Sequence, residues 1–161
     1  MPKVYLAADH AGFDLKNALV AHLATLGYEV EDLGASVLNP DDDYPDFVMP
    51  LAEKVASEPA TRGIICGGSG EGEAMCANRV KGVRAAAFYG KMAVTAALEV
   101  EGGKSEDGFD IVRLARKHND ANVLSMGARF ISAHEADEAV RIFLETPFSE
   151  APRHARRLAK F

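Results

Sequence analysis

The sequence predicts an α/β protein, a three-layer α/β/α fold around a five-stranded parallel sheet of the Rossmann-like kind. Short apolar runs with β-branched residues alternate along the chain with longer segments whose apolar residues recur at helical spacing. Clusters of glycine, proline and aspartate separate these segments. Because such alternation joins parallel strands through helices, we expect helices on both faces of the sheet and a ligand site at the carboxyl ends of the strands.

The first elements are a strand, a helix and a second strand. Residues 4–8 form a short apolar run with a β-branched and an aromatic residue, and Asp9 ends it. Residues 13–26 carry leucines at helical spacing, and Gly27 supplies a C-terminal stop. Residues 29–33 are the expected second strand.

The middle of the chain continues the same alternation. Pro45 stands where proline is common at a helix start, which predicts a helix that continues to Ser57. An apolar strand at 63–66 then leads into a glycine-rich loop, followed by a helix that reaches Asn78. The next apolar run predicts a strand at 83–88.

The last part of the chain contains one irregular stretch among regular elements. A helical pattern resumes at Met92, and the charged, glycine-containing residues 99–110 indicate an insertion. The remaining elements are expected to be, in order, a helix at 111–117, a strand at 123–126, a helix at 135–144 and a terminal helix at 153–159.

Length and composition set limits on the class of protein. With 161 residues and 48% apolar content, the chain fits a single domain over 1–161. No segment approaches the roughly 20 apolar residues that cross a bilayer, and no secretory signal pattern is present. Cys66 and Cys76 match neither a disulfide framework nor a metal-binding pair. The net charge of −6 argues against a nucleic-acid surface. We therefore expect a soluble, cytoplasmic protein without nucleic-acid or membrane partners.

The C-terminal segment, residues 152–161, is basic in an otherwise acidic chain. It is expected to be a helix that carries Arg153, Arg156 and Arg157. Such a cluster could hold an anion, because guanidinium groups bind phosphate and carboxylate oxygens in pairs. Its charges could equally face solvent and bind nothing.

The glycine-rich loop at 67–73 is the strongest local signal. Four glycines within six positions lie between a predicted strand and a predicted helix, so backbone amides can approach an anionic oxygen closely. A dinucleotide fingerprint needs a third glycine where Glu73 stands, and a P-loop needs a lysine followed by serine or threonine. We therefore expect neither NAD nor a nucleoside triphosphate. A tight turn that only joins strand to helix is the alternative.

Three other features resemble metal or reactive sites without matching them. His134 lacks the second histidine of a zinc-protease helix. The aspartates at 41–43 lack the alternating ligands and the closing glutamate of a calcium loop, so we interpret them as a solvated loop with a helix cap. Cys76 is expected to be a small buried thiol. We expect no metal and no cofactor.

Four motifs in this order resemble the ribose-5-phosphate isomerase type B family, which also includes galactose-6-phosphate and allose-6-phosphate isomerases. They are residues 8–12, residues 67–73 with Ala77 and Asn78, residues 115–124 and residues 153–157. The resemblance runs almost from end to end. It implies a metal-independent aldose–ketose isomerase of a phosphorylated sugar, with ribose 5-phosphate first among the substrates. It also implies a homodimer, or a dimer of dimers, with active sites shared between subunits.

The resemblance further implies roles for individual residues. Glu73 would be the base, and His118 would transfer a proton when the sugar ring opens. Asp9 and His10 would contact sugar hydroxyls, the loop amides would hold the reacting oxygens, and His118 with Asn119 would come from the partner subunit. Three arginines would clamp the phosphate. The expected substrate-binding set is Asp9, His10, Gly68, Ser69, Gly70, Glu71, Gly72, Asn119, Arg129, Arg153 and Arg157.

Two features depart from the pattern of many family members. A cysteine base commonly stands immediately before the Gly-Ser-Gly triplet, but here Gly67 occupies that position and Cys66 lies one residue earlier. Because side chains alternate along a strand, Cys66 would face the opposite side. A second branch of the family uses a glutamate at the position of Glu73, so Glu73 is the expected base. The insertion at 99–110 is the other departure, and it leaves the substrate open.

Alternatives therefore remain at this point. A tetrose or hexose phosphate is an alternative substrate, and a non-catalytic phosphosugar-binding module is an alternative function. The direction of the pKa shift of Glu73 is also open, because burial would raise this pKa whereas a helix N-terminus would lower it.

Overall fold

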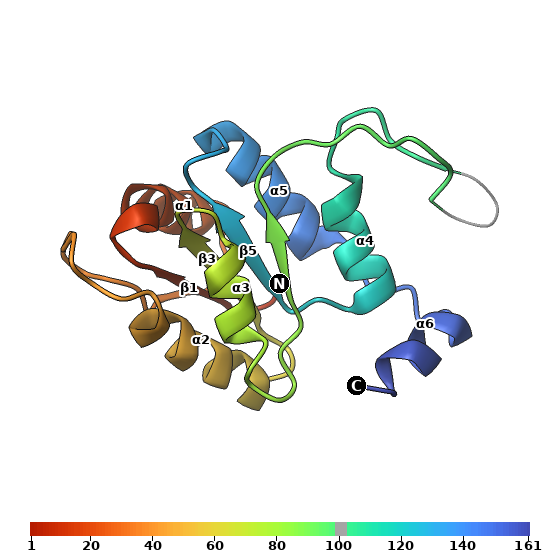
Figure 1. Cartoon of the computed structure of the whole chain (residues 1–161), viewed down its shortest axis with the longest axis horizontal. Coiled ribbons are helices and arrows are strands. Elements are labelled where there is room, and N and C mark those ends of the chain that lie inside the picture. Colours follow the sequence, from red (N-terminus) through yellow and green to blue (C-terminus); the bar gives the residue numbers. More distant parts are fainter. Residues whose placement is uncertain (99–102) are drawn as a thin grey trace.

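The computed structural model describes residues 1–98 and 103–161, which form a five-stranded parallel sheet between two layers of helices (Figure 1). This architecture confirms the predicted three-layer α/β/α class. The elements are, in chain order, β1 (Val4–Ala8), the 3-10 turn η1 (His10–Gly12), α1 (Phe13–Thr25), β2 (Val30–Asp32), α2 (Pro45–Ser57), β3 (Arg62–Gly67), α3 (Glu71–Ala77), β4 (Ala85–Phe88), α4 (Asp110–Asn119), β5 (Val123–Gly127), α5 (Ala133–Glu145) and α6 (Pro152–Leu158).

The order of the strands positions the site. The sheet runs β2-β1-β3-β5-β4, and every neighbouring pair is parallel. The chain leaves β1 towards β2 on one side and then crosses to β3 on the other, so the topological switch lies between β1 and β3. In the register, Ala8 pairs with Cys66 and Gly67 pairs with Gly127. The loops after β1, β3 and β5 therefore meet at one edge of the sheet.

Each face of the sheet packs against its own helices. Leu6 and Ile64 belong to a buried cluster with residues of α1, α4 and α5, whereas Tyr5 and Ile65 belong to a second cluster with residues of α2 and α3. All five residues of β1 are buried because both faces are covered. This double burial explains why β1 has a continuous apolar sequence rather than an alternating one.

The helix expected at Met92 is absent. Residues 91–98 have no helical structure, and most of them are exposed. The chain leaves β4 as an arm that projects from the body (Figure 1). It returns at Phe109, whose ring lies 5.7 Å from that of Phe88. The amide of Met92 donates to Gly108 O at 3.0 Å and so joins the two limbs of the arm. The prediction failed because helical spacing stabilises little when the apolar stripe has no core to cover.

The expected insertion at 99–110 lies partly outside the described residues, namely at 99–102. Residues 103–109 form the returning limb of the arm, and α4 begins at Asp110. The basic segment at 152–161 contains α6 and its short tail. None of the described helices is long and apolar enough to cross a membrane.

Candidate active site

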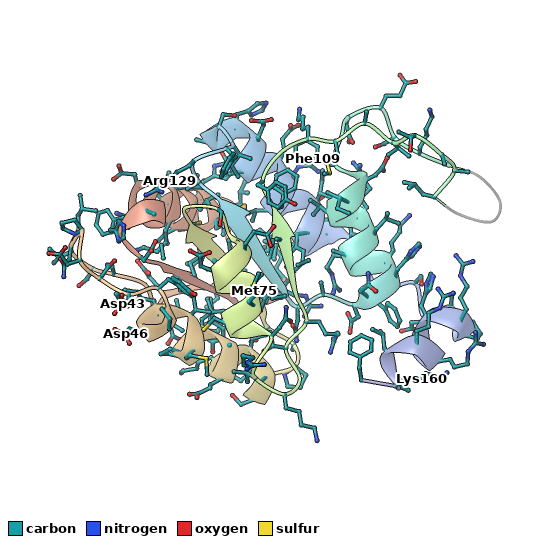
Figure 2. All side chains as sticks on the ribbon, in the orientation of Figure 1. Asp43, Asp46, Met75, Phe109, Arg129 and Lys160 are labelled. Carbon is teal, nitrogen blue, oxygen red and sulfur yellow. The ribbon has the colours of Figure 1, made fainter. Side chains whose placement is uncertain are left out.

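One cleft lies at the carboxyl edge of the sheet, where the loops after β1, β3 and β5 meet. Its lining residues are Asp9, His10, Ala11, Tyr44, Gly68, Ser69, Gly72, Glu73, Arg129 and Phe130. Figure 2 shows Arg129 close to the carboxyl end of β5. The cleft therefore brings together seven of the predicted site residues. Gly70 and Glu71 belong to the glycine-rich segment at 67–73 that joins β3 to α3, which we call the glycine turn.

Asp9 is held by the turn that it begins. Its carboxylate accepts a hydrogen bond from the amide of Ala11 at 3.0 Å, and the residue is only 7% exposed. The turn lies directly on β3, because a Cβ at Gly12 would overlap the carbonyl of Cys66. Only glycine permits this approach. It brings Asp9 and His10 up to the glycine turn that follows β3.

The glycine turn is fastened to its neighbours by buried hydrogen bonds. Gly70 adopts a left-handed conformation, with φ of 79°, and caps α3. Its carbonyl accepts from Ala74 N at 3.1 Å and from the buried hydroxyl of Ser125 at 2.7 Å. Ala128 N donates to the carbonyl of Gly67 at 2.8 Å. These bonds fix the turn against β5 and the residues that follow it.

Glu73 lies in the first turn of α3, and it is 5% exposed. Its carboxylate packs against the Cα of Gly67, where a side chain would overlap it. Burial raises the pKa of Glu73, and the charge of Asp9 adds to this increase. Hydrogen bonds from the amides of Glu73 itself and of Gly70 act in the opposite direction. The sequence left open the direction of the pKa shift of Glu73. In the structure the pKa is raised, because the effect of desolvation is larger than that of the hydrogen bonds from the helix start.

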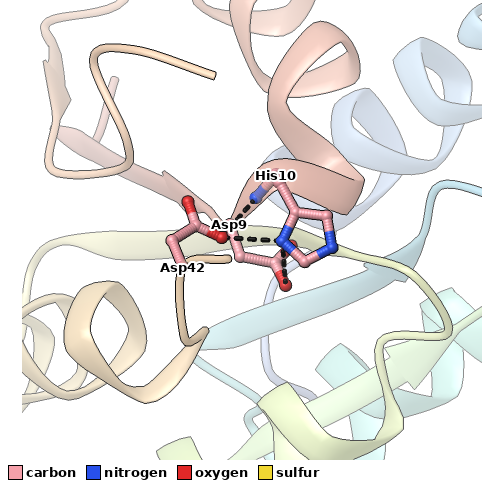
Figure 3. A group of neighbouring side chains, drawn as sticks. All are labelled: Asp9, His10 and Asp42. Carbon is pink, nitrogen blue, oxygen red and sulfur yellow. Dashed lines mark hydrogen bonds and ion pairs between the residues drawn. The ribbon is translucent and has the colours of Figure 1, made fainter. Parts of the chain in front are cut away.

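His10 lies between two carboxylates (Figure 3). Its Nδ1 is 2.7 Å from Asp42 Oδ1 and 3.8 Å from Asp9 Oδ2. The hydrogen bond to Asp42 raises the pKa of His10, and the charge of Asp9 acts in the same direction, whereas desolvation and Arg129 lower this pKa. The imidazolium form of His10 is therefore favoured relative to a free histidine.

The expected role of the aspartates at 41–43 as a solvated loop with a helix cap is wrong for Asp42. The side chain of Asp42 is only 9% exposed, and it bonds to His10. The helix it precedes, α2, has Tyr44 at its N-cap and no side-chain capping bond. Tertiary packing therefore directs this carboxylate into the site instead of into solvent.

Asp9, His10 and Asp42 are also the one group of potential metal ligands among the residues that the structure describes, with ligand atoms within 4.8 Å of one another. The 2.7 Å separation between His10 and Asp42 is typical of a hydrogen bond. Ligand atoms around a tetrahedral zinc ion stand about 3.4 Å apart. The group could hold a cation only after the hydrogen bond opens.

Four other predicted site residues lie outside this cleft, namely His118, Asn119, Arg153 and Arg157. His118 and Asn119 end α4 and line a second cavity beside β4 with Phe161. The ring of His118 lies 4.0 Å from that of His154 in α6, and Arg153 Nε lies 3.0 Å from His154 Nε2. Arg157 is exposed on the same helix. Figure 2 shows Lys160, just beyond α6, on the opposite side of the molecule from Arg129.

Several residues of these two regions were not among the predicted site residues. Tyr44 packs against the glycine turn, since a Cβ at Gly72 would lie 3.0 Å from its hydroxyl. Phe130 lines the cleft and makes an edge contact with Tyr89. His154 is 3% exposed beneath His118. Each resembles an ordinary helix-start, loop or helix residue, and the fold brings each of them beside a predicted site residue.

Cys66 has no access to the cleft. It is completely buried in the cluster formed with α1, α4 and α5, and burial raises the pKa of its thiol far above the usual range. A neutral, buried thiol cannot serve as a base.

The fold and the site together define a class of protein, a doubly wound α/β protein whose cleft lies at the topological switch and contains a buried carboxylate beside a glycine turn. Comparison with known families is more specific. The model of the Ribose/Galactose Isomerase family matches residues 4–106 and 106–161. The chain therefore belongs to the ribose/galactose isomerase family.

Individual relatives agree with this assignment. Ribose-5-phosphate isomerase B of Mycobacterium tuberculosis is 40% identical over 97% of this chain and 85% of its own length. The enzyme of the same name from Mycolicibacterium paratuberculosis is 38% identical over 97% of this chain and 87% of its own length. The crystal structure of ribose-5-phosphate isomerase B from Mycoplasma genitalium with bound ribulose-5-phosphate has a TM-score of 0.84 and 35% identity. It covers 98% of this chain and 92% of its own.

Proposed function

We propose that this chain is an aldose–ketose isomerase that interconverts ribose 5-phosphate and ribulose 5-phosphate through an enediolate, with Glu73 as the base. The observation that carries the proposal is the buried carboxylate of Glu73, which has a raised pKa and faces the cleft beside the glycine turn. The names of the relatives, and the ribulose-5-phosphate bound to one of them, support the choice of substrate.

The reaction moves a proton between C1 and C2 of the sugar, and one base on one face of the substrate can carry it both ways. A carboxylate suits this task better as its pKa rises towards the working pH. Glu73 therefore takes the proton from C2, and an enediolate forms. Backbone amides of the glycine turn stabilise its oxygen, at roughly 3 to 4 kcal/mol for each preorganised donor. No metal ion is needed for charge stabilisation in this scheme.

Of the expected phosphate clamp, only Arg129 lines this cleft, and the other two arginines and the ring-opening histidine lie elsewhere in the same chain. Arg153 and Arg157 belong to α6, and His118 contacts this helix through His154. Lys160, just beyond α6, lies on the side of the molecule away from Arg129 (Figure 2). A homodimer in which a partner subunit supplies the two arginines and the ring-opening histidine would complete the site. His118 then transfers a proton during ring opening, which suits an imidazole near neutral pH.

Replacement of the base tests the proposal. We expect Glu73→Gln to lower kcat for ribose 5-phosphate by about a thousandfold, within the range for loss of a general base. Cys66→Ala, as the control, should leave turnover largely unchanged, and so should prior dialysis against a chelator. Exchange of solvent deuterium into C2 of the substrate separates catalysis from passive binding. A Glu73→Gln protein with wild-type turnover would exclude this base.

A further inference from the structure

Asp42 is joined to His10 by two hydrogen bonds that end on the same oxygen. Oδ1 of Asp42 accepts from the backbone amide of His10 at 2.9 Å and lies 2.7 Å from Nδ1 of the His10 ring. The two residues are 32 positions apart and belong to different loops. Because one oxygen fixes both the backbone and the ring of His10, the rotation of this side chain is restricted.

The loop before α2 holds Asp42 in place. The amide of Asp42 donates to Asn39 O at 3.2 Å, and the amide of Asp41 donates to Asn39 Oδ1 at 3.1 Å. α2 begins a few residues later, at Pro45. The Asp42 carboxylate is thus presented by a turn that its own neighbours stabilise, and His10 is not needed to form that turn.

The second carboxylate oxygen of Asp42, Oδ2, is buried without a hydrogen bond, which is energetically unfavourable. Among the described residues, Asp42 Oδ2 is the one buried side-chain nitrogen or oxygen without a hydrogen-bond partner. A buried carboxylate oxygen without a donor is unfavourable, and such a group calls for an explanation beyond stability. The two hydrogen bonds between Asp42 Oδ1 and His10, a residue that lines the cleft, are such an explanation.

The hydrogen bonds also determine what His10 offers to a ligand. With Nδ1 directed at Asp42, Nε2 lies on the side of the ring away from both carboxylates (Figure 3). The charged groups around the ring are Asp9, Asp42 and, with opposite sign, Arg129, and Glu73 faces the same cleft. A histidine held in this way keeps its proton on Nδ1 and presents Nε2 in a constant direction.

We propose that Asp42 is a positioning residue for the isomerase reaction, because it holds His10 in the rotamer and tautomer that contact the sugar. The proposal rests on the proposed function, in which His10 binds sugar hydroxyls. Asp42 itself does not line the cleft; it acts through the imidazole.

The first experiment compares two neighbouring aspartates. Asp42→Asn should lower kcat/KM for ribose 5-phosphate about ten- to hundredfold, the range for loss of a hydrogen bond to a charged group. Asp41→Asn removes the same charge from an exposed neighbour, so it should leave kcat/KM unchanged. Equal activities for the two variants would overturn the proposal. Thermal unfolding of each variant checks that it is folded.

A double-mutant cycle separates positioning from a role in the loop alone. If Asp42 acts through His10, Asp42→Asn should cause little further loss in a His10→Ala background. If Asp42 only supports the loop, the two losses should multiply, which contradicts the proposal. Asp42→Glu, which keeps the carboxylate, should recover part of the activity that Asp42→Asn loses.

Nuclear magnetic resonance of the imidazole nitrogens supplies a readout that needs no substrate. The His10 signals are identified by their absence in His10→Ala. In Asp42→Asn we expect the titration midpoint of His10 to shift downward, whereas Asp41→Asn should leave it in place. An unchanged His10 in Asp42→Asn overturns the positioning role. If the wild-type chain does not turn over ribose 5-phosphate, the proposed function fails, and these spectra still report on the pairing.

Discussion

Glu73 shows how a single side chain can have conflicting influences on its charge. Its position in the first turn of α3 places backbone amides near the carboxylate, and these amides favour the ionised form. Burial at 5% exposure and the nearby charge of Asp9 favour the protonated form, and burial is the larger effect. The result is a carboxylate that holds its proton more tightly than an exposed glutamate does, which suits the role of base that we propose for it.

This raised pKa predicts a specific pH dependence of stability. Between the ordinary value of 4.5 and the raised value, the folded chain binds more protons at Glu73 than the unfolded chain, so stability falls as the pH rises through this window. Glu73→Gln removes that loss. We expect the variant to unfold at a higher temperature than the wild type near neutral pH, with the difference shrinking as the pH falls towards 4.5.

Thermal unfolding between about pH 4.5 and 7 measures the difference between the two proteins. Glu71→Gln is the control, because Glu71 lies at the first position of α3, where its charge is favourable, and its loss should bring no gain in stability. If the unfolding temperatures of wild type and Glu73→Gln change with pH in parallel, the raised pKa of Glu73 is contradicted. In the active protein, kcat/KM should fall as the pH drops through the raised pKa, because the base must be ionised.

The sequence indicated Glu73, Asp9 and His10 but missed Asp42, and the reason is physical. A glutamate after a glycine triplet and a polar pair after a buried strand have fixed places at a sheet edge, so the topology alone brings them together. Asp42 is one of three consecutive aspartates in a loop, and nothing local distinguishes it from Asp41. Only the packing of η1 against the loop before α2 selects it.

At the scale of elements, the glycine turn joins the end of β3 to the start of α3, which carries the proposed base, Glu73. Gly67 closes β3, and the Glu73 carboxylate occupies the space where a side chain at this position would stand. Gly70 starts α3 in a left-handed conformation that other residues rarely adopt. Gly67 and Gly70 therefore serve different purposes, which a sequence pattern cannot distinguish.

Alanine substitutions at neighbouring glycines test this view of the turn. In Gly67→Ala the new methyl group would displace the Glu73 carboxylate, so we expect kcat/KM to fall by about a hundredfold, as misplacement by about 1 Å can cause. At Gly68 the nearest atoms to a Cβ belong to the flexible side chain of Arg129, at 3.4 Å. Gly68→Ala should therefore lose less activity. Steady-state kinetics measure kcat/KM of both variants. A Gly67→Ala protein as active as Gly68→Ala would refute the steric argument.

The regular elements were predictable because their sequences are consistent with their burial. The continuous apolar run of β1 reflects cover on both faces, and α2 begins at Pro45 as expected. The arm after β4 was not predictable, because the helical spacing at Met92 does not reveal whether a core surface is available. A local sequence pattern determines an element only where tertiary packing stabilises that element.

At the scale of the whole molecule, the predicted site falls into two groups. Asp9, His10 and Glu73 line the cleft at the switch point, whereas His118 ends α4 against His154 in α6. Within one chain of this structure, the two groups line different cavities. A symmetric dimer could unite them twice, with each cleft receiving the second group from the other subunit.

This arrangement makes a quantitative prediction for mixed dimers. In a homodimer, Glu73→Gln would remove the proposed base from every site, and His118→Ala would strongly slow turnover of cyclic ribose 5-phosphate at every site. When the two variants are unfolded together and refolded in equal amounts, half of the dimers should be mixed. One cleft of each mixed dimer then contains both substitutions, and the other contains neither. We expect recovery of about a quarter of wild-type activity, because one site in four is intact. Refolding each variant alone is the control, and a mixture as inactive as its components would mean that each cleft is completed within its own chain.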